Sequence, residues 1–497
     1  MNRLVIVSNR VGDIDKSTQT GGLAVAIADT LRKRGGIWFG TGEPGSTPRN
    51  AAAGGGNVRQ ITVPLTQDEY QAHYAGFSNS VLWPLFHYRT DLLDYHAEEH
   101  AGYLDVNRRL AEELAPLLQD DDLVWVHDYH LLPFAGFLRR TSSRRMRIGF
   151  FLHIPFPPPE VLAALPGHRA LLRSLLDHDV VGFQTARDVA NFFGTIEALG
   201  LGERISQSVI RSDGRSIHCG RFPIAIDSGR FHAMGRSTHE DIRIDDMRRR
   251  MLNRKQIVGV DRLDYSKGIP ARFEAFEKLL ETHRELEGRI SLLQIAPPTR
   301  EGIRAYDTIR RETEALAGAI NGRFADFNWT PIKYIHRAVA RDRLAAIFRG
   351  SEIGLVTPLR DGMNLVAKEY VAAQDPGDPG VLVLSRFAGA AEEMEEALLV
   401  NPHDTDEMAR RLHQAIAMPR AERCARHEAL MARISARSVD DWAADFLAVL
   451  QKGGDASQGR HPGGGPAGEH GTGGGRGSGY RPGAGTVPPE SSAACRP

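Results

Sequence analysis

The chain has 497 residues, which is too long for one ordinary domain and suits two or three. Lys plus Arg and Asp plus Glu number 62 each, so the net charge is zero, which argues against the basic surface of a nucleic-acid-binding protein. The apolar run at residues 4–7 is too short for a signal peptide, and no apolar stretch approaches the ~20 residues of a membrane span.

Three cysteines, Cys219, Cys424 and Cys495, have a spacing that fits neither a disulfide framework nor a zinc site, and they favour a reducing compartment. We therefore expect a cytoplasmic protein without a membrane or a nucleic acid as partner.

Short β-branched runs followed by polar residues predict strands in both halves of the chain. These runs lie at 4–8, 123–127, 147–152 and 180–184 in the first half, and at 256–260, 290–295, 332–335, 353–357, 381–384 and 398–400 in the second. Amphipathic helical stretches, such as 271–286 and 338–349, lie between them. Alternating strands and helices predict an α/β protein with two Rossmann-like, doubly wound parallel sheets.

Two sheets divide the chain into a first domain at 1–228 and a second at 229–452, with a boundary near 228–254 and a last helix at 439–450. The segment 42–56 is rich in glycine and is predicted to be a mobile loop. Residues 453–497 consist mainly of Gly, Pro, Ser, Arg and Ala, and this composition predicts a disordered tail.

The first polar cluster follows the first strand. Arg10 ends that strand, and Gly21 and Gly22 then open a helix. Paired glycines allow a close approach to an anionic group, and a helix N-terminus supplies free N–H donors. A simple turn before a helix explains the same residues, so both interpretations stay open.

Arg262 and Lys267 follow the strand at 256–260. A planar guanidinium and a compact ammonium suit a diphosphate. The alternative is surface ion pairing with Asp261 and Asp264. We favour the binding role, because Lys267 and Gly268 resemble the entry of a helix at a sheet edge.

Asp361 and Gly362 form a second loop that enters a helix. Glu369 lies eight residues after Asp361, about two helical turns, so both carboxylates are expected on one helix face. They suit hydroxyl groups of a sugar and of a ribose. The alternative is an N-cap at Asp361 and an exposed Glu369.

His127, Asp128, His130 and His153 also follow strands. Two histidines and an aspartate suggest a metal site, but a third clear ligand is missing and we predict no metal. Three prolines after His153 are expected to direct its side chain toward a cleft, although a capped strand end is the simpler interpretation. The aromatic segment 77–89 suits a sugar face, but core packing is the usual reason for such density.

Together these motifs resemble the trehalose-6-phosphate synthase family, retaining glycosyltransferases of the GT-B fold, in which two Rossmann-like domains face a central cleft. The resemblance runs from Arg3 to about Leu450 and leaves the tail from Gly453 without a counterpart. The matching blocks lie, in order, at 77–88, 124–130, 149–157, 258–270, 321–324, 356–370 and 387–391.

The resemblance implies transfer of glucose from a nucleoside diphosphate glucose, usually UDP-glucose, to glucose 6-phosphate, which gives α,α-trehalose 6-phosphate. The residues it assigns to the donor are Gly22, Arg262, Lys267, Asp361, Gly362, Met363, Asn364, Leu365, Val366 and Glu369. Among them Arg262 and Lys267 hold the diphosphate, and Glu369 takes the ribose. Asp361 and His153 contact the transferred glucose.

The acceptor residues implied by the resemblance are Arg10, Tyr74, Trp83, Asp128 and Arg300. The implied catalytic set is Arg262, Lys267, His153, Asp128 and Asp361. The implied mechanism is a front-face transfer in which the leaving diphosphate takes the acceptor proton. This route needs no cofactor and no metal.

One position departs from the family pattern. A Trp typically follows the Phe-Gly pair that ends the second strand, whereas Thr41 follows Phe39 and Gly40 here. The acceptor is therefore left open: a related transferase with a glycerol phosphate or an aminocyclitol phosphate acceptor is the first alternative, and a non-catalytic sugar-phosphate sensor is the second. The donor nucleotide also stays open among UDP, GDP and ADP, and we expect a homo-oligomer.

Overall fold

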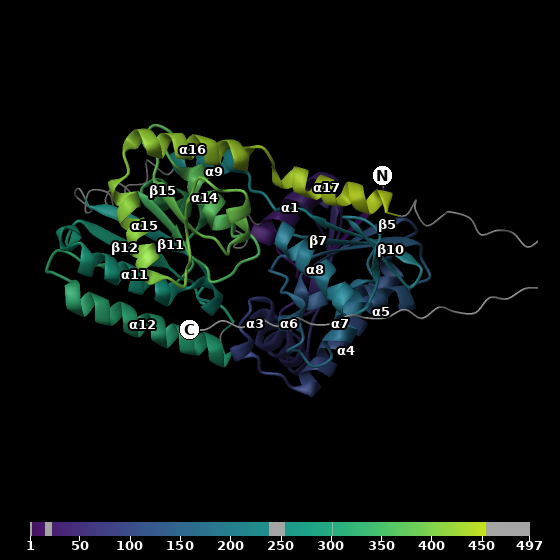
Figure 1. Cartoon of the computed structure of the whole chain (residues 1–497). Coiled ribbons are helices and arrows are strands. Elements are labelled where there is room, and N and C mark those ends of the chain that lie inside the picture. The colour runs from purple at the N-terminus through teal and green to yellow at the C-terminus, as the bar shows by residue number, and fades with distance from the viewer. Residues whose placement is uncertain (1, 15–21, 238–253, 301, 454–497) are drawn as a thin grey trace, which may run out of the picture. The chain divides into compact units, whose positions relative to one another are not determined.

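A computed structural model describes residues 2–14, 22–237, 254–300 and 302–453 (Figure 1). The chain forms two α/β halves in sequence order, and each half is built on its own sheet. Within the described residues, no helix is both long enough and apolar enough to span a membrane. Apart from Gly453, the predicted tail lies outside the described residues, as does most of the predicted domain boundary.

The first sheet has ten strands in the order β3-β4-β2-β1-β5-β6-β7-β10-β9-β8. Its seven central strands pair in parallel, whereas β3, β9 and β8 pair antiparallel at the two edges. The strands are β1 (Leu4–Arg10), β2 (Gly36–Thr41), β3 (Arg49–Ala53), β4 (Val58–Val63), β5 (Asp122–His127), β6 (Met146–Phe151), β7 (Val180–Phe183), β8 (Glu203–Arg204), β9 (Val209–Ser212) and β10 (Arg215–Arg221).

The second sheet has six strands, all parallel, in the order β13-β12-β11-β14-β15-β16. Its strands are β11 (Lys255–Val260), β12 (Ile290–Ile295), β13 (Ile332–Ile335), β14 (Ile353–Val356), β15 (Val381–Ser385) and β16 (Leu398–Val400). The strand order reverses direction beside β11 and β14, and such a switch point is where open parallel sheets bind ligands.

The helices of the first half are α1 (Gly22–Arg34), α2 (Gln67–Tyr70), α3 (Trp83–Phe86), α4 (Ala97–Leu114), α5 (Phe134–Thr141), α6 (Pro159–Leu162), α7 (His168–Leu175), α8 (Ala186–Ala198) and α9 (Ser228–Ser237). A π-helix, η2 (Gln71–Leu82), joins α2 to α3. Short 3₁₀ turns occur at η1 (Gly54–Gly56), η3 (Thr90–Leu92), η4 (Ala115–Leu117) and η5 (Tyr129–Leu131).

The helices of the second half are α11 (Ile269–Thr282), α12 (Arg304–Phe324), α13 (Arg341–Arg349), α14 (Leu365–Ala373), α15 (Thr405–Ala417), α16 (Arg420–Ser435) and α17 (Val439–Lys452), with 3₁₀ turns at η7 (Tyr265–Lys267), η8 (Arg284–Leu286) and η9 (Gly389–Glu392). Alternate residues of β11 enter two different cores: Ile257 packs in the core that includes α11, α12 and α15, and Val258 in the core that includes α13 and α14. The second sheet is therefore covered on both faces, as parallel sheets usually are.

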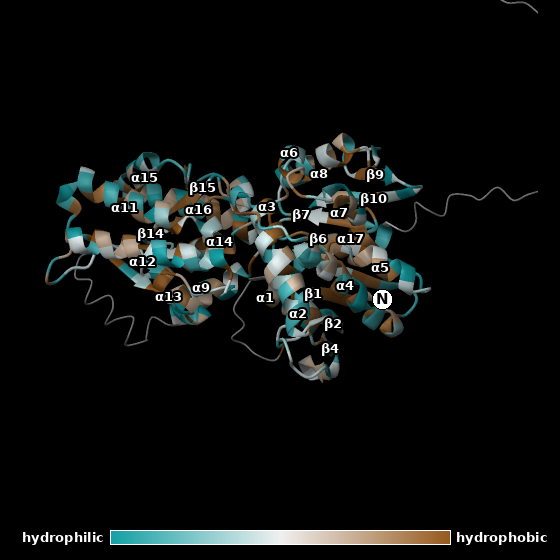
Figure 2. Cartoon of the chain, turned by 90° about the horizontal axis from the view of Figure 1, so that it is seen from below, coloured by the Kyte–Doolittle hydropathy of each residue, from teal (hydrophilic) through white to brown (hydrophobic). Residues whose placement is uncertain are grey.

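Figure 2 shows the corresponding pattern, with apolar strands inside and helices that mix polar and apolar residues. Large exposed apolar side chains are limited, among the described residues, to Ile205 and Phe327.

The last helix, α17, follows the second sheet in sequence but packs on strands of the first (Figure 1). The rings of Trp442 and Phe446 lie 4.9 Å and 4.6 Å from that of Trp125 on β5. Gly149 and Gly182 make room for it, because a Cβ at either residue would lie within 2.8 Å of the Phe446 ring. Burial of these aromatic rings ties the end of the chain back to the first half.

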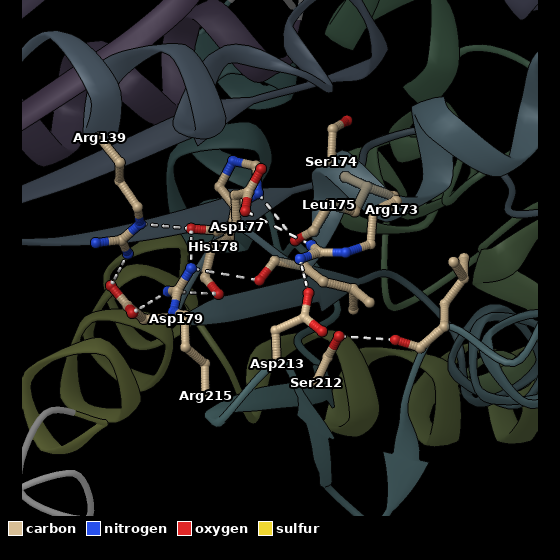
Figure 3. Close-up of polar contacts among 12 residues, drawn as sticks. Arg139, Arg173, Ser174, Leu175, Asp177, His178, Asp179, Ser212, Asp213 and Arg215 are labelled. Carbon is tan, nitrogen blue, oxygen red and sulfur yellow. Dashed lines mark hydrogen bonds and ion pairs between the residues drawn. The ribbon is translucent and has the colours of Figure 1, made fainter.

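A polar cluster stabilises the first sheet at the amino end of β7, an inner strand. Asp179 accepts hydrogen bonds from Arg139, from Arg215 and from the backbone N–H of Ile148, each at 2.8 Å (Figure 3). Arg173 and Asp213 form a second ion pair nearby. These residues lie at the amino end of β7, opposite the carboxyl strand ends that carry the motif residues described below.

All ten predicted strands are present, and the prediction of an α/β fold with two parallel sheets is confirmed. The pattern of apolar runs missed β2, β3, β4, β8, β9 and β10, and only the resemblance placed the end of β2, at Phe39 and Gly40. Part of the predicted loop at 42–56 is therefore the edge strand β3, paired with β4.

Candidate functional site

The candidate site is formed at the carboxyl ends of parallel strands in both halves. Arg10 ends β1, Asp128 follows β5 and His153 follows β6. In the second sheet, Arg262 and Lys267 follow β11, and the loop 361–364 follows β14. The two sets make direct contacts with each other, so the motif residues from distant parts of the sequence meet at one place.

The Lys267 ammonium forms an ion pair of 2.5 Å with the Asp361 carboxylate, and both side chains are largely buried. The same Asp361 carboxylate accepts from the Asn364 side chain and from the Gly362 N–H, each at 3.0 Å. Burial alone raises the pKa of Asp361, but the charge of Lys267 outweighs this effect and holds the pKa below its ordinary value. Asp361 is therefore a fully engaged carboxylate.

Asn364, and not Asp361, caps helix α14, because its side chain accepts from the N–H of Ala367. Asp361 precedes the helix, so the expectation that it shares a helix face with Glu369 is wrong. The N–H groups of Leu365 and Val366 begin α14, where backbone donors lack a partner within the helix. Donors at such a helix start suit an anionic group, and they lie beside Asp361 and its partner Lys267.

Glu369 lies on the second turn of α14 and is paired with Arg341, at the start of α13, at 2.9 Å. Burial raises the pKa of Glu369, and Arg341 opposes the rise. Arg341 was missed by the sequence analysis, because an arginine in a polar segment carries no signal of a partner 28 residues away.

The side chain of His153 is held by a chain of hydrogen bonds. The backbone N–H of Ile224 donates to Gln184 Oε1 at 3.0 Å, so the Gln184 amide nitrogen faces His153 Nδ1 at 3.5 Å. His153 Nδ1 must then accept, and the Nε2–H donates to His127 Nδ1 at 3.0 Å. Burial lowers the pKa of His153 to about 3, which keeps its ring neutral.

In the first half, the Arg10 guanidinium lies 5.3 Å from the centre of the Tyr74 ring and forms an ion pair of 3.3 Å with Glu43. The Tyr74 ring in turn stacks on His130, with centres 5.7 Å apart and planes 6° from parallel. His130 is buried, and burial holds its pKa well below the ordinary value. Neutral rings thus support an exposed arginine.

Arg300 lies 3.7 Å from the centre of the Trp83 ring, an arrangement that combines cation–π attraction with packing. The Arg262 guanidinium also lies over the Trp83 indole, 5.5 Å from the centre of the ring. Arg300 also donates to the Tyr129 hydroxyl at 3.0 Å. Trp83 and Tyr129 belong to the first half and both arginines to the second, so the two halves share this cluster.

Asp128 has a positive φ of 77° between β5 and η5, which is uncommon for a residue other than glycine and marks local strain. Its carboxylate accepts from the backbone N–H of His153 at 3.3 Å. Burial raises the pKa of Asp128 to about 6, although the amides of His153 and Tyr129 and the charges of Arg300 and Arg262 lower it. A strained, buried carboxyl at a strand end is typical of a functional site.

A cavity of about 1230 Å³ opens beside two of the predicted site residues. It is lined by Tyr74 and Arg300, and by residues of η2, α12 and the loop that ends in Tyr265. This volume exceeds the few hundred Å³ of a typical small-molecule site, so a small polar molecule would have room to reach Tyr74 and Arg300.

Thr41 does not take the place of an aromatic ring in this cavity. Its side chain is buried, and its hydroxyl donates to the backbone oxygen of Asn9, the residue before Arg10. Thr41 therefore supports the end of β1, which carries Arg10.

Of the predicted site residues, the structure brings Arg262, Lys267, Asp361, Asn364, His153, Asp128, Trp83 and Arg300 into one connected set. Gly362 joins this set through its backbone and Met363 is buried beside it, whereas Gly22 lies at the edge of residues outside the described part, and its contacts are not described. Most of the aromatic segment is core, as expected: Phe77, Leu85 and Phe86 are buried.

One group of three side chains within the described ranges has the spacing of a metal site: His283, Glu285 and His413. It lies on η8 and α15, away from the motif residues. The two imidazole rings stack in parallel at 3.7 Å, so their in-plane lone pairs cannot both point at one ion. The prediction that the functional site needs no metal stays a prediction.

The geometry defines what the site can do. Two cations and a helix N-terminus face one region, which suits a diphosphate. Arg300 over Trp83 and Arg10 over Tyr74 add two guanidinium groups on aromatic rings, which suit a second phosphate on a small polar molecule.

The model of glycosyltransferase family 20 matches residues 6–452. The chain is 46% identical over 454 residues to the trehalose-6-phosphate synthase of Klebsiella pneumoniae, covering 91% of this chain and 95% of that protein. Among solved structures it is similar to an α,α-trehalose-phosphate synthase (UDP-forming) from Burkholderia xenovorans in complex with glucose-6-phosphate, with 48% identity, a TM-score of 0.87 and coverage of 90% and 100%. It is also similar to a trehalose-6-phosphate protein of E. coli bound with UDP-2-fluoro glucose, with 44% identity, a TM-score of 0.86 and coverage of 91% and 99%.

Proposed function

The chain belongs to glycosyltransferase family 20, and we propose that it is a trehalose-6-phosphate synthase. In this function it transfers glucose from UDP-glucose to glucose 6-phosphate and retains the anomeric configuration. The observation that carries the proposal is a shared contact of two arginines that we assign to different phosphates: Arg262 and Arg300 lie over one indole ring, that of Trp83. A donor diphosphate and an acceptor phosphate would therefore be held side by side.

On the donor side, we assign Arg262 and Lys267 to the diphosphate, together with the N–H groups that begin α14. Glu369, aligned by Arg341, takes the ribose hydroxyls. His153 and Asp361 contact the transferred glucose, and Gly362 allows the loop to approach it closely. Because the pKa of His153 is about 3, its ring is neutral and does not donate a proton from an imidazolium.

On the acceptor side, we assign Arg10, Tyr74, Trp83 and Arg300 to the phosphate of glucose 6-phosphate, and Asp128 to its sugar. Two arginines suit a phosphate dianion, because each presents a planar fork of N–H donors. The cavity beside Tyr74 and Arg300 supports this assignment, since it opens on the side of the acceptor residues.

A front-face transfer fits the protonation and pairing of the carboxylates. A double displacement needs a free carboxylate nucleophile near the anomeric carbon. Asp361 is held by Lys267, Asn364 and the Gly362 N–H, and it cannot leave these partners without burying an unpaired ammonium. We therefore propose that the leaving diphosphate oxygen takes the proton of the acceptor hydroxyl as the sugar passes through an oxocarbenium-like state.

Arg262 and Lys267 would stabilise the negative charge that develops on the leaving diphosphate. Two fixed side-chain cations supply the charge stabilisation that a divalent ion gives, so we propose that neither a metal nor a cofactor is required. EDTA should leave the rate unchanged, whereas strong dependence on added Mg²⁺ would contradict this part of the proposal.

A nucleotide-release assay tests the function. UDP-glucose, GDP-glucose and ADP-glucose are each offered with glucose 6-phosphate, glycerol phosphate and an aminocyclitol phosphate, and the products are identified by mass and NMR. We expect UDP release that depends on glucose 6-phosphate and an α,α-1,1-linked disaccharide phosphate. Release only with another acceptor would move the function to a related transferase, and donor binding without turnover would favour a sensor.

The variant Arg262→Ala sharpens this test. Loss of one fixed cation at the leaving group should lower turnover by about 10³-fold. The matched control is Arg254→Ala, because Arg254 lies just before β11 and donates to the backbone oxygen of Asn328, outside the site. Unchanged turnover in Arg262→Ala would contradict the assignment of the diphosphate. We also propose that the protein works as a homo-oligomer, which light scattering at assay concentration would test.

A further inference from the structure

Asp264 is a fully buried carboxylate beside the arginines that we assign to the two phosphates, and no role in the reaction has been assigned to it above. It lies between β11 and η7, in the same loop as Arg262 and Lys267. Its two carboxylate oxygens have different partners, and the partners belong to different parts of the site.

The Oδ1 atom holds the donor loop. It accepts from the backbone N–H of Ser266 at 2.9 Å and so caps the turn that ends in Lys267. The indole N–H of Trp83 also points at Oδ1, at 3.4 Å. This oxygen therefore connects the turn of the second half with the aromatic ring of the first.

The Oδ2 atom holds the acceptor arginine. It accepts from Arg300 Nη1 at 3.0 Å and from the Tyr306 hydroxyl at 3.1 Å. The side chain of Arg300 is only 4% exposed, and it has a positive φ of 50°. A buried guanidinium on a strained backbone needs a fixed counter-charge to keep one orientation, and Asp264 is that counter-charge.

We propose that Asp264 is a positioning residue for the acceptor: it orients the guanidinium of Arg300 and the indole of Trp83 to receive the acceptor phosphate, without touching the substrate itself. This inference rests on the proposed function, because it concerns the acceptor pocket of that same site. The contacts on Oδ2 carry the acceptor role, whereas the contact of Oδ1 with Ser266 carries the shape of the donor loop.

Asp264 keeps its charge throughout the working range of pH. Burial by itself raises its pKa, but the charges of Arg300, Arg262 and Lys267 outweigh burial and hold the pKa at about 2. An ionised carboxylate accepts from all four donors at once. An asparagine keeps its carbonyl oxygen as an acceptor toward Ser266 and Trp83. Its N–H₂ group then faces Arg300 and Tyr306, and this group cannot accept the hydrogen bonds that they donate.

The variant Asp264→Asn therefore separates the two oxygens. Isothermal titration with glucose 6-phosphate and with UDP is the measurement. We expect the Kd for glucose 6-phosphate to rise by about tenfold or more, and the Kd for UDP to change by less than about threefold. Steady-state kinetics should show the same split, with a raised KM for the acceptor and a smaller change in kcat.

The matched control is Asp261→Asn. Asp261 is also buried, lies in the same loop and forms an ion pair of 2.9 Å, but its partner is Arg272, which is bonded to Thr357 and Gln294 rather than to acceptor residues. A general disturbance of the loop would affect both variants in the same way. Equal losses of acceptor affinity in Asp261→Asn and Asp264→Asn would overturn the inference.

A double-mutant cycle tests whether Asp264 works through Arg300. In an Arg300→Gln background, Asp264→Asn should raise the Kd for glucose 6-phosphate by less than about twofold, because the group it positions is gone. Additive effects would overturn the inference. If Asp264→Asn does not fold, Tyr306→Phe removes one donor from Oδ2, should raise the acceptor Kd by about threefold, and should leave the UDP Kd unchanged.

The outcomes distinguish this inference from the proposed function. If the wild-type protein does not bind glucose 6-phosphate, both are overturned. If the wild type binds and turns over glucose 6-phosphate while Asp264→Asn binds it equally well, only the positioning role of Asp264 is overturned.

Discussion

The backbone of Gly362 lies so close to the carbonyl oxygen of His153 that a Cβ at residue 362 would overlap it. Gly362 belongs to the loop after β14 in the second half, and His153 follows β6 in the first. The close approach therefore brings the donor loop against the histidine that we assign to the transferred glucose. Only glycine allows it.

The variant Gly362→Ala should push these two strand ends apart. We expect donor affinity to fall by about tenfold or more, with a loss of about 2 kcal/mol in the free energy of unfolding, because backbone and not a flexible side chain stands in the way. UDP titration and urea unfolding are the measurements. Gly318→Ala is the control: it lies in α12 with open space around it, and alanine should raise stability there by about 0.5–1 kcal/mol. Wild-type donor affinity in Gly362→Ala would contradict the role of this contact.

Asp128 is predicted to lower stability while it serves the reaction. The pKa of this carboxyl rises from 3.8 in the unfolded chain to about 6 in the folded protein, so between these values the folded protein binds the proton more tightly. Its contribution to the free energy of unfolding therefore falls as the pH rises through that window, by up to about 3 kcal/mol at neutral pH.

The variant Asp128→Asn cannot ionise, and it should be more stable than the wild type by about 1–3 kcal/mol at pH 7 and equally stable near pH 4. Turnover should fall by about 10²-fold or more, because the acceptor loses a charged hydrogen-bond partner. Urea unfolding at several pH values, with activity measured at pH 7, checks both. If the variant is less stable than the wild type at pH 7, burial of the ionised Asp128 does not lower the free energy of unfolding, and this prediction is wrong.

The sequence predicted the parts of this molecule that depend on local pattern. All ten strands that were predicted from apolar runs followed by polar residues are present. The same pattern placed Arg262, Lys267 and Asp361 after the carboxyl ends of strands. The edge strand β3 and the ladder of β8 and β9 were missed, because short polar strands such as Arg49–Ala53 and Glu203–Arg204 have no apolar alternation.

Contacts between distant residues could not be read from pattern. Surface ion pairing of Arg262 and Lys267 with Asp264 was the alternative left aside in the sequence analysis, and Asp264 is in fact fully buried and holds Arg300. Gln184 and Arg341 orient His153 and Glu369, and neither lies in a recognisable motif. The last helix follows the second sheet in sequence, and only the packing of Trp442 on Trp125 shows that it returns to the first.

Thr41 should influence the acceptor indirectly. Its hydroxyl donates to the backbone oxygen of Asn9, next to Arg10, so Thr41→Val removes this bond at nearly constant volume and loosens the end of β1. We expect the KM for glucose 6-phosphate to rise by about threefold to tenfold and the Kd for UDP to stay the same. Thr30→Val is the control, because Thr30 is also buried but bonds only within its own helix, to the oxygen of Ala26. Equal effects of the two variants would assign Thr41 to stability alone.

Asp179 offers the opposite case, a residue whose loss should affect stability and not catalysis (Figure 3). Its carboxylate accepts from Arg139, Arg215 and the Ile148 N–H, so Asp179→Ala leaves two partly buried guanidinium groups and an amide without their acceptor. We expect the free energy of unfolding to fall by about 2–4 kcal/mol.

Asp213→Ala is the control from the same figure. Asp213 is 70% exposed and pairs with Arg173, so its loss should lower the free energy of unfolding by less than about 1 kcal/mol. Both variants should keep kcat/KM for both substrates within about twofold at 25 °C, because the cluster lies at the amino end of β7 and the site at the carboxyl ends of the strands. A large fall in kcat/KM for Asp179→Ala under conditions where it remains folded would mean that this edge of the sheet is coupled to the site.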